Sequence, residues 1–587
     1  MTRGYAVRAV ATLALLSAGG CGLLTSNHVT VGADDPADET LAGAGAESAG
    51  RGGAAAGDGT HGGGSAGSSN TGVAGEANAD VDCADAVPVD GDVAVYWPAE
   101  VEALPLMKHI AGNLTIHQAA ADLSPFRCLE SVAGNFDVGL TTELSSLDQL
   151  GRLRSIGKSL RITGNQALRS LAGLSSLSSV GANLEVEDNP VLLELNGLER
   201  LTTLGDVSLR DNAALGSLTG LAAVERVEAL AIVENSALAS LDGLALTHAT
   251  SLTLTDNTQL VQIEALSSLT EMPEDFAIDV ERNDHLLSLD GLEHLAVLGD
   301  LTVNGNAALQ SVAGLAGVRS AGAVSVKDNA ALPTLDGLDL QRADSLTVTG
   351  NVNLVQVDAL SSLTTVRDTI SIRDNARLGS LELGGLTRAS TLDIGGNSSL
   401  VSLAGLAGLT AIDTLWLSAR SLTSLEGLHH VTHLGSAELD APLADLSGLR
   451  KVASAVWLTL IDTKVHDLSG LGEARIADSL VLRDNEELDS LSGLAPNQRL
   501  GLLQIGGSPK LGDLAGLEAL ESANELYIVN NVTLSSLNGL DNLSAIGGYE
   551  FRDNPQLPTC AITALLVRCG AEGGGQIVGN DDEAACD

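Results

Sequence analysis

Two tryptophans and one glutamate are the residues of this sequence whose types and spacing best fit a binding site. The chain of 587 residues holds only three tryptophans, and Trp416 and Trp457 fall two repeats apart with Glu438 between them. If the repeats stack as parallel strands, these three side chains lie in one outward-facing row. Exposed aromatic rings beside a carboxylate stack on sugars or hold a loop of a partner protein. We predict a ligand-binding patch here; the alternative is that the tryptophans only cover an irregular turn.

Two further side chains are predicted to take part in ligand binding. Tyr527 falls in the same outward row, and His433 belongs to the segment "GLHHVTHLG" with His429 and His430. A metal site at these histidines is not expected, because no carboxylate or cysteine stands at a matching spacing. We therefore predict neither a metal nor a cofactor.

Outward-facing pairs of carboxylates raise the question of catalysis. Glu185 with Glu187, and Asp279 with Glu281, stand two residues apart on predicted strands. Such pairs are about 7 Å apart, and we expect nothing basic or aromatic beside them to shift a pKa. The chain is therefore not expected to be an enzyme. A solenoid-type enzyme that degrades polysaccharides is the third interpretation.

A repeat positions all of these side chains. Segments such as "VSLRDNAALGSLTGL" recur, and the 389 residues from Asn165 to Asn554 divide into 17 steps of about 23 residues. Each repeat has a strand that alternates apolar and polar residues, followed by apolar residues at every third position, which fits short extended or 3₁₀ pieces. After Asn212 these positions are Leu215, Leu218, Leu221, Val224 and Val227. A single repeat cannot bury a stable core, whereas stacked repeats can. The pattern predicts a mainly β, parallel solenoid of about twenty 23-residue coils in one elongated domain.

One asparagine closes the strand of most repeats. Its side chain is expected to bond the backbone of the turn and to form a ladder from coil to coil. The predicted ladder consists of Asn165, Asn189, Asn212, Asn235, Asn257, Asn283, Asn306, Asn329, Asn351, Asn375, Asn397, Asn485, Asn531 and Asn554. The asparagine is lost in "LWLSARSL", "AELDAPLADL" and "LTLIDTKV", the stretch that carries Trp416 and Trp457.

These repeats resemble leucine-rich repeats, and more closely the receptor L domain. The segment "CADAVPVDGDVAVYWPAEVEALPLMKHIAGNLTI" resembles the opening of such a domain, and "NPQLPTC…GNDDEAAC" resembles the end of bacterial lipoproteins with many such coils. The resemblance implies a right-handed solenoid with a cap and first coils over 83–130, repeats over 131–554 and a C-terminal cap over 555–587. The larger number of coils and the spacing "N-x-x-L" depart from the family pattern, so receptor ligands are not carried over.

The cysteines beyond Cys21 lie near the two ends of the predicted solenoid. Because solenoid ends expose core and need caps, disulfides there are expected in an oxidising compartment. We predict the pairs Cys83–Cys128 and Cys560–Cys586, which leave Cys569 without a partner.

The N-terminus is typical of an exported protein. Residues 1–20 carry Arg3 and Arg8 before a short apolar run. The segment "LLSAGGCG" resembles a bacterial lipobox, although Ala18 stands where leucine is commonest. The resemblance implies lipidation of Cys21 and, with Gly22 after it, an outer-membrane address; an ordinary cleaved signal is the alternative. Residues 21–82 are rich in Gly, Ala and Ser and are expected to form a disordered tether.

The net charge of −44, from 31 basic and 75 acidic residues, argues against nucleic acid and anionic lipid as partners. It favours cationic ligands or diffuse binding of divalent cations. The combined prediction is a lipid-anchored, surface-exposed recognition or adhesion protein that binds a protein or polysaccharide on its sheet face and meets the membrane only through its lipid. The alternative is a structural scaffold or spacer of the envelope.

Overall fold

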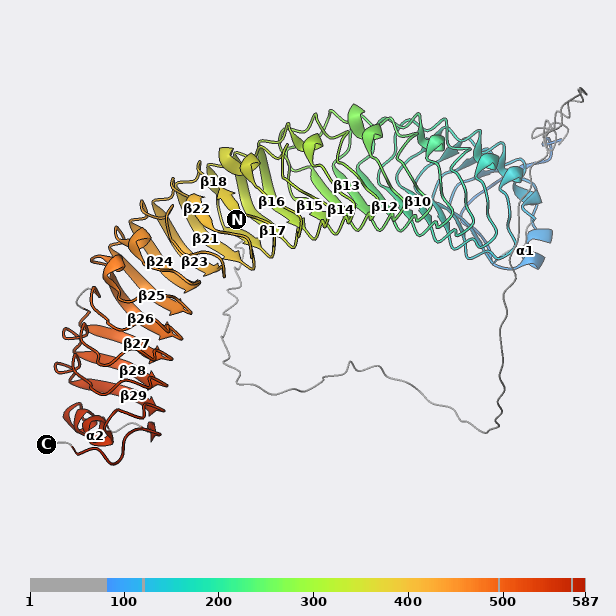
Figure 1. Cartoon of the computed structure of the whole chain (residues 1–587). Helices are drawn as coiled ribbons and strands as arrows, with labels where there is room; N and C mark the ends of the chain where they lie inside the picture. Colours follow the sequence, from blue (N-terminus) through green and yellow to red (C-terminus); the bar gives the residue numbers. More distant parts are fainter. Residues whose placement is uncertain (1–81, 119–121, 495–496, 572–573, 586–587) are drawn as a thin grey trace, which may run out of the picture. The chain divides into compact units, whose positions relative to one another are not determined.

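The computed structural model describes residues 82–118, 122–494, 497–571 and 574–585 (Figure 1). The predicted signal peptide, the lipidated Cys21 and the tether up to residue 81 lie outside the described residues, as does Cys586. Within the described ranges, no helix is both long enough and apolar enough to cross a membrane.

One long parallel sheet runs through the chain, with each strand paired to the strand of the next coil. Its strands are β2 (Val93–Val95), β4 (Leu114–His117), β6 (Phe136–Gly139), β8 (Leu160–Thr163), β10 (Leu184–Glu187), β11 (Val207–Arg210), β12 (Ala229–Val233), β13 (Ser251–Thr255), β14 (Ala277–Glu281), β15 (Leu301–Asn304), β16 (Ser320–Lys327), β17 (Arg342–Thr349), β18 (Thr365–Val366), β19 (Thr369–Arg373), β21 (Arg388–Gly395), β23 (Ala411–Ser418), β24 (His433–Asp440), β25 (Ser454–Ile461), β26 (Arg475–Arg483), β27 (Arg499–Gly506), β28 (Ser522–Val529), β29 (Ala545–Arg552) and β30 (Gln576–Val578).

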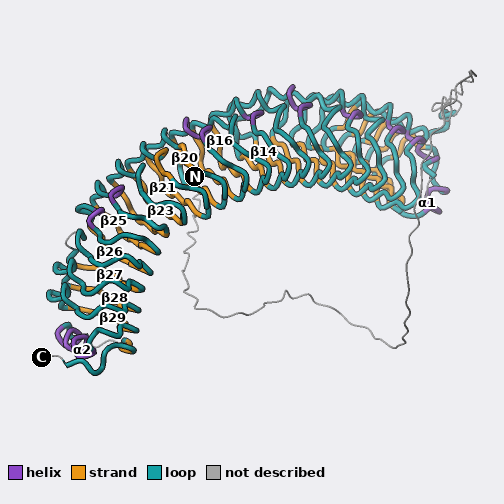
Figure 2. Tube along the Cα trace, in the orientation of Figure 1, coloured by secondary structure: helices purple, strands orange, loops and turns teal. Residues whose placement is uncertain are grey.

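Shorter elements complete each coil. A second parallel sheet joins β1 (Val87–Val89), β3 (Met107–Ile110), β5 (Ser131–Val132), β7 (Ser155–Ile156) and β9 (Ser179–Val180), and a third pairs β20 (Ser380–Glu382) with β22 (Ser402–Gly405). The 3₁₀ turns are η1 (Ser124–Phe126), η2 (Asp148–Leu150), η3 (Ala172–Leu174), η4 (Thr219–Leu221), η5 (Glu264–Ser268), η6 (Ala313–Leu315), η7 (Asp358–Ser362), η8 (Ser447–Leu449) and η9 (Ser469–Leu471). Helix α1 (Pro98–Glu102) lies near the N-terminal end of the solenoid and α2 (Thr559–Arg568) near its C-terminal end. Strands and 3₁₀ turns follow different sides of the solenoid (Figure 2).

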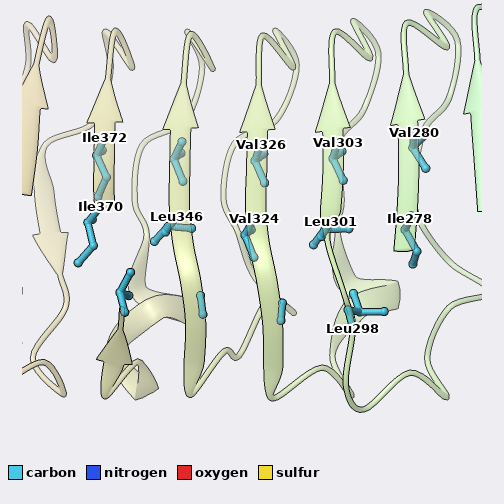
Figure 3. Packing of buried hydrophobic residues seen from close by; sticks show 14 of the residues in the cluster. Ile278, Val280, Leu298, Leu301, Val303, Val324, Val326, Leu346, Ile370 and Ile372 are labelled. Carbon is cyan, nitrogen blue, oxygen red and sulfur yellow. The ribbon is translucent and has the colours of Figure 1, made fainter. Parts of the chain in front are cut away.

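The core is a set of aliphatic columns that run from coil to coil. The inward positions of neighbouring strands stack on one another, as Leu301, Val324 and Leu346 do in Figure 3. All apolar positions predicted after Asn212 are buried, and η4 supplies one of the 3₁₀ turns expected there. The fold is a mainly β, parallel, leucine-rich-repeat-like solenoid of about 21 turns of about 23 residues.

The asparagine ladder is present in the structure. Each ladder asparagine is buried, and its Nδ2 donates to a carbonyl of an earlier coil, as Asn189 does to Ile162 O at 2.8 Å. Its Oδ1 accepts the backbone N–H of the preceding ladder residue, as Asn189 does from Asn165 at 3.2 Å. These contacts link the asparagines from Asn165 to Asn397 in turn. They satisfy backbone groups that the tight turns would otherwise bury without partners.

Thr141 and Ser508 each replace the ladder asparagine in a single coil. Three consecutive coils also replace it. Ala419, Ala441 and Thr463 follow Asn397 at intervals of 22 residues, and all three are buried. An alanine side chain supplies neither a donor nor an acceptor, so the ladder is interrupted under β23 and β24. Thr463 restores part of it, because its Oγ1 donates to Asn485 Oδ1 at 2.6 Å.

The residue before the ladder position has a left-handed backbone in many coils. Aspartate or asparagine commonly takes this position, as Asn530 does with φ 57°, whereas Gly305 takes it in its own coil with φ 68°. This conformation costs most L-residues roughly 1–2 kcal/mol, and asparagine tolerates it best. Gly305→Val is therefore expected to lower the unfolding free energy by about 1–2 kcal/mol, and Gly305→Asn by clearly less. Urea denaturation of the two variants measures the difference; equal losses would contradict the backbone explanation.

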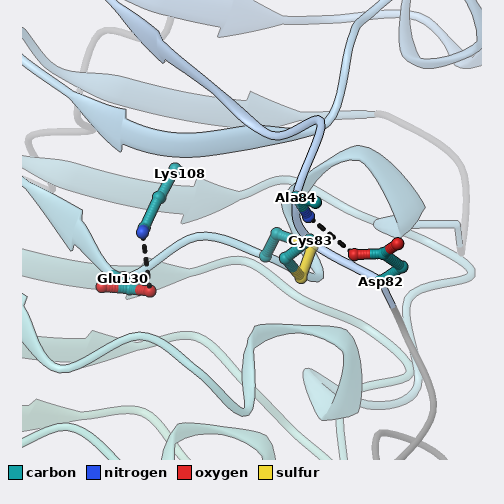
Figure 4. Close-up of a disulfide and its surroundings, with 6 residues drawn as sticks. Asp82, Cys83, Ala84, Lys108 and Glu130 are labelled. Atoms are coloured by element: carbon teal, nitrogen blue, oxygen red, sulfur yellow. Dashed lines mark hydrogen bonds and ion pairs between the residues drawn. A yellow bond between two sulfur atoms is a disulfide. The ribbon is translucent and has the colours of Figure 1, made fainter.

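The N-terminal end is closed by the predicted Cys83–Cys128 disulfide, whose Cα atoms are 5.7 Å apart (Figure 4). The Lys108–Glu130 ion pair, at 3.6 Å, lies close to it. At the other end Cys560 is disulfide-bonded, but its predicted partner Cys586 lies outside the described residues. Cys569 is a buried free thiol, and burial raises its pKa.

Candidate functional site

Strands β23, β24 and β25 carry the residues predicted to bind a ligand. Trp416 points away from the core because its neighbours Leu415 and Leu417 are both buried inward residues. Trp416 is 42% exposed. Glu438 is its direct partner on the next strand and is half-buried.

The predicted row is wrong at Trp457. In the sheet, Glu438 pairs with Thr459, whereas Trp457 pairs with Ser436, one outward position earlier along the strand. The cause is the shortened coil: Glu438 and Thr459 are only 21 residues apart, two fewer than the usual repeat. The outward residue between the buried Leu458 and Leu460 is thus Thr459.

The two tryptophans nevertheless meet. Their ring centroids are 6.0 Å apart and the ring planes form an angle of 73°. Strands two positions apart in a sheet are separated by about 9.5 Å. The rings must therefore lean toward each other across β24, the strand that carries Glu438. We call Trp416, Glu438 and Trp457 the tryptophan corner.

The carboxylate of the tryptophan corner is destabilised in its charged form. Burial raises the pKa of Glu438 most, the neighbouring Asp440 raises it further, and Arg483 acts in the opposite direction. Among the described residues, the Glu438 carboxylate has no hydrogen bond and no ion pair. A half-buried carboxylate without a partner is a cost that the fold does not itself compensate.

Two more polar atoms beside the corner accept no hydrogen bond from a described residue, and the sequence analysis did not name them. Thr459 is 4% exposed, and its Oγ1 has no hydrogen bond to any described residue. Asp440 Oδ2 accepts a hydrogen bond from Ser418 at 3.0 Å. Its Oδ1 accepts none from the described residues, although Arg420 Nη2 lies 3.7 Å away. The pattern "LTL" in "WLTLI" is the sequence signal that could have identified Thr459 as outward-facing.

The other two predicted ligand-binding residues lie outside the tryptophan corner. His433 begins β24, and its Nε2 lies 3.5 Å from Asp413 Oδ1. Tyr527 lies on β28, five strands from Trp416, and its hydroxyl donates to Glu525 Oε2 at 2.6 Å. This hydrogen bond is the main cause that raises the pKa of Tyr527 to about 12.

The histidines do not form a metal site in the described part of the chain. The ring centroids of His429 and His430 are 4.3 Å apart with the planes tilted by 51°, and His433 faces Asp413 instead. No group of three or more His, Cys, Asp or Glu side chains within the described ranges is arranged to hold a metal ion.

The expectation that nothing basic lies beside the carboxylate pairs is wrong. Arg161 Nε donates to Glu185 Oε2 at 2.7 Å, since the residues are partners on adjacent strands. Arg282 Nη1 donates to Glu281 Oε2 at 2.9 Å. Burial also raises the pKa of Asp279. Both neighbours could have been found from the sequence, since Arg282 directly follows Glu281 and Arg161 stands one repeat before Glu185.

Comparisons with known proteins find similar solved structures but neither a matching family model nor a matching curated protein. Among solved structures, TLR13 in a complex with ssRNA13 is 13% identical, with 80% of this chain and 81% of that chain covered and a TM-score of 0.28.

Two bacterial structures are similar to a comparable degree. An internalin (InlF) of Listeria monocytogenes is 14% identical, with 75% of this chain and 83% of that chain covered and a TM-score of 0.20. A leucine-rich repeat protein of Leptospira interrogans (LIC12759) is 14% identical, with 78% and 91% covered and a TM-score of 0.24. At these values the similarity carries no argument about function, which depends on the chain's own residues.

Proposed function

We propose that this chain is a recognition or adhesion protein of the cell surface, anchored in the outer membrane by a lipid on Cys21. It binds a protein or polysaccharide ligand on its strand face at the tryptophan corner. The observation that carries this proposal is the pair of tryptophan rings 6.0 Å apart on the outward face, with a half-buried, unpaired carboxylate between their strands.

The other outward residues of the strand face support the tryptophan corner as the location of the binding site. The outward row from β13 to β19 consists mainly of small polar residues, among them Thr253, Thr302, Ser325, Thr347 and Ser371. Such residues offer little apolar area to a ligand. Large exposed aromatic residues contribute most binding energy in interfaces. The tryptophan corner is therefore the place on this row where binding energy concentrates.

A fluorescence titration tests the proposal. The full chain carrying Trp97→Phe is titrated with fractionated envelope polysaccharides and surface proteins, and the emission of Trp416 and Trp457 is followed. A saturable shift with one fraction is expected. Trp457→Ala should weaken this binding by about tenfold or more, because a central aromatic contact is lost.

Thr347→Ala is the matched control, since Thr347 lies on the same sheet face far from the tryptophans and should leave the affinity unchanged. Emission that no fraction alters would reject the proposal. It would favour the second candidate, an envelope scaffold without a ligand, for which the uniform small polar row is the supporting observation.

A further inference from the structure

Resting on the proposed function, we infer that the tryptophan corner binds the cationic group of a lysine or arginine side chain from a basic protein partner. The inference chooses the protein over the polysaccharide as the class of ligand. It follows from the geometry of the rings, the unpaired carboxylate, the orphan acceptors and the charge of the chain.

The two rings meet edge to face, and the angle between their planes leaves ring faces on either side of it. A cation is attracted to the face of tryptophan within about 6 Å of the ring centroid, more strongly than to tyrosine or phenylalanine. With the centroids 6.0 Å apart and the planes at 73°, one cation can lie within that distance of both rings. The two rings thus form two walls of a cation site.

Glu438 supplies the charge between these walls. Its strand lies between those of Trp416 and Trp457, and its carboxylate has no ion pair with any described residue. A bound cation would provide the missing partner. Charge-assisted hydrogen bonds are about twice as strong as neutral ones, and partial burial strengthens them further.

Two oxygen atoms beside the tryptophan corner that accept no hydrogen bond from a described residue favour a cation that carries N–H groups. Thr459 Oγ1 and Asp440 Oδ1 flank Glu438 on the neighbouring strand and on its own strand and accept no hydrogen bond from a described residue, although both atoms are buried and Asp440 Oδ1 lies 3.7 Å from Arg420 Nη2. An ammonium or guanidinium can donate to such acceptors, whereas a quaternary ammonium cannot. A sugar hydroxyl would leave the charge of Glu438 without a counter-charge.

The nearest resident cation does not fill the site. Arg483 influences Glu438 electrostatically but makes no ion pair with it, because it lies on β26, two strands away. Arg420 pairs with Asp462 at 2.6 Å and lies 3.7 Å from Asp440. The net charge of −44 attracts a basic partner over a longer range.

Four small probes test the chemistry on the full chain carrying Trp97→Phe. They are Nα-acetyl-lysine amide, Nα-acetyl-arginine amide, choline and 3,3-dimethylbutan-1-ol, which is the uncharged isostere of choline. Tryptophan emission reports binding. The lysine and arginine probes should bind about tenfold more tightly than the isostere and more tightly than choline.

Glu438→Gln keeps the shape of the side chain and should weaken the lysine and arginine probes by about tenfold. It removes a half-buried charge, so the variant should fold at least as well, which a thermal melt verifies. Asp279→Asn is the matched control: Asp279 lies on the same face and its pKa is also raised by burial, but on β14 it is far from the tryptophans. It should leave the affinity unchanged.

Three outcomes would overturn the inference. Equal binding of choline and its isostere would indicate an apolar platform without selection for charge. Choline that binds more tightly than both amino-acid probes would assign the site to a small quaternary ammonium. A third outcome is that no small probe binds, while one of the polysaccharide or surface-protein fractions binds equally well to the Glu438→Gln variant. The cation site is then rejected and the proposed function stands. If, in addition, none of the polysaccharide and surface-protein fractions binds, both the cation site and the proposed function are rejected.

Discussion

Asn329→Ala is expected to lower the free energy of unfolding by about 3–5 kcal/mol. The side chain of Asn329 makes four hydrogen bonds inside the solenoid. It donates to Val303 O at 2.8 Å and Asn351 Oδ1 at 3.2 Å, and it accepts from the backbone N–H and the Nδ2 of Asn306 at 3.0 and 3.2 Å. Alanine removes all four. At least two backbone groups in a dry interior then lose a partner, at about 1–3 kcal/mol each.

Asn397→Ala is the matched control from the same ladder. Asn397 is just as buried, but the next position is Ala419, so its side chain makes only two hydrogen bonds. It donates to Ile372 O at 2.7 Å and accepts from the Asn375 backbone N–H at 2.9 Å. Both variants leave two backbone groups without a partner, so the expected loss is smaller than that of Asn329→Ala only by the two side-chain links, about 1–2 kcal/mol. Urea denaturation measures both, and hydrogen exchange at the Asn306 amide shows whether the loss is local. Equal losses would mean that the links between asparagines add nothing.

The period and chemistry of the repeat made most of the fold predictable. Alternating apolar residues in each strand and apolar residues at every third position afterwards leave few alternatives to a parallel solenoid. The ladder could be predicted for a similar reason: an asparagine that recurs at the same position of most coils needs partners, and stacked coils place the partner at the same position of the next coil.

The register at Trp457 could not be predicted from the same pattern. Counting repeats assumes a constant length, but the coils that follow Asn397 lose residues in different places. In the coil of Trp416 the left-handed residue before the ladder position is missing, whereas Asp462 restores it with φ 53° before Thr463. The interval from Glu438 to Thr459 also lacks the left-handed residue, because Asp440 directly precedes the ladder position Ala441, and it loses one further residue elsewhere in the coil. Only the observed pairing of β24 with β25 locates it.

The electrostatic environment of the candidate site could not be predicted from the sequence either. The raised pKa of Glu438 comes mainly from burial, and the contact between the rings of Trp416 and Trp457 depends on how their side chains lean; spacing encodes neither. The same coils lack the ladder asparagine. Fewer buried hydrogen bonds lie under the tryptophan corner than under β15 or β16, which is consistent with a local sequence shaped by a surface requirement rather than by stability.

Removal of the Cys83–Cys128 disulfide is expected to destabilise the N-terminal coils by about 4 kcal/mol. The bond closes a chain segment with a sequence separation of 45, and the chain-entropy model gives about this value for a loop of that length. Cys83→Ala with Cys128→Ala removes it without placing a hydroxyl at position 128, which is buried. Hydrogen exchange at the amides of β4 and of β27 measures the effect at both ends of the array.

The loss should be confined to the N-terminal coils. Each coil contacts only its neighbours, so stability is approximately a sum of coil and interface terms, and an opened cap frays the array from that end. The amides of β4 should exchange much faster in the double variant, whereas those of β27, more than a dozen coils away, should keep their protection. Mild reduction of the unaltered chain is the control and should give the same pattern at β4. Faster exchange at β27 as well would contradict nearest-neighbour coupling and would show that the solenoid unfolds as one cooperative unit.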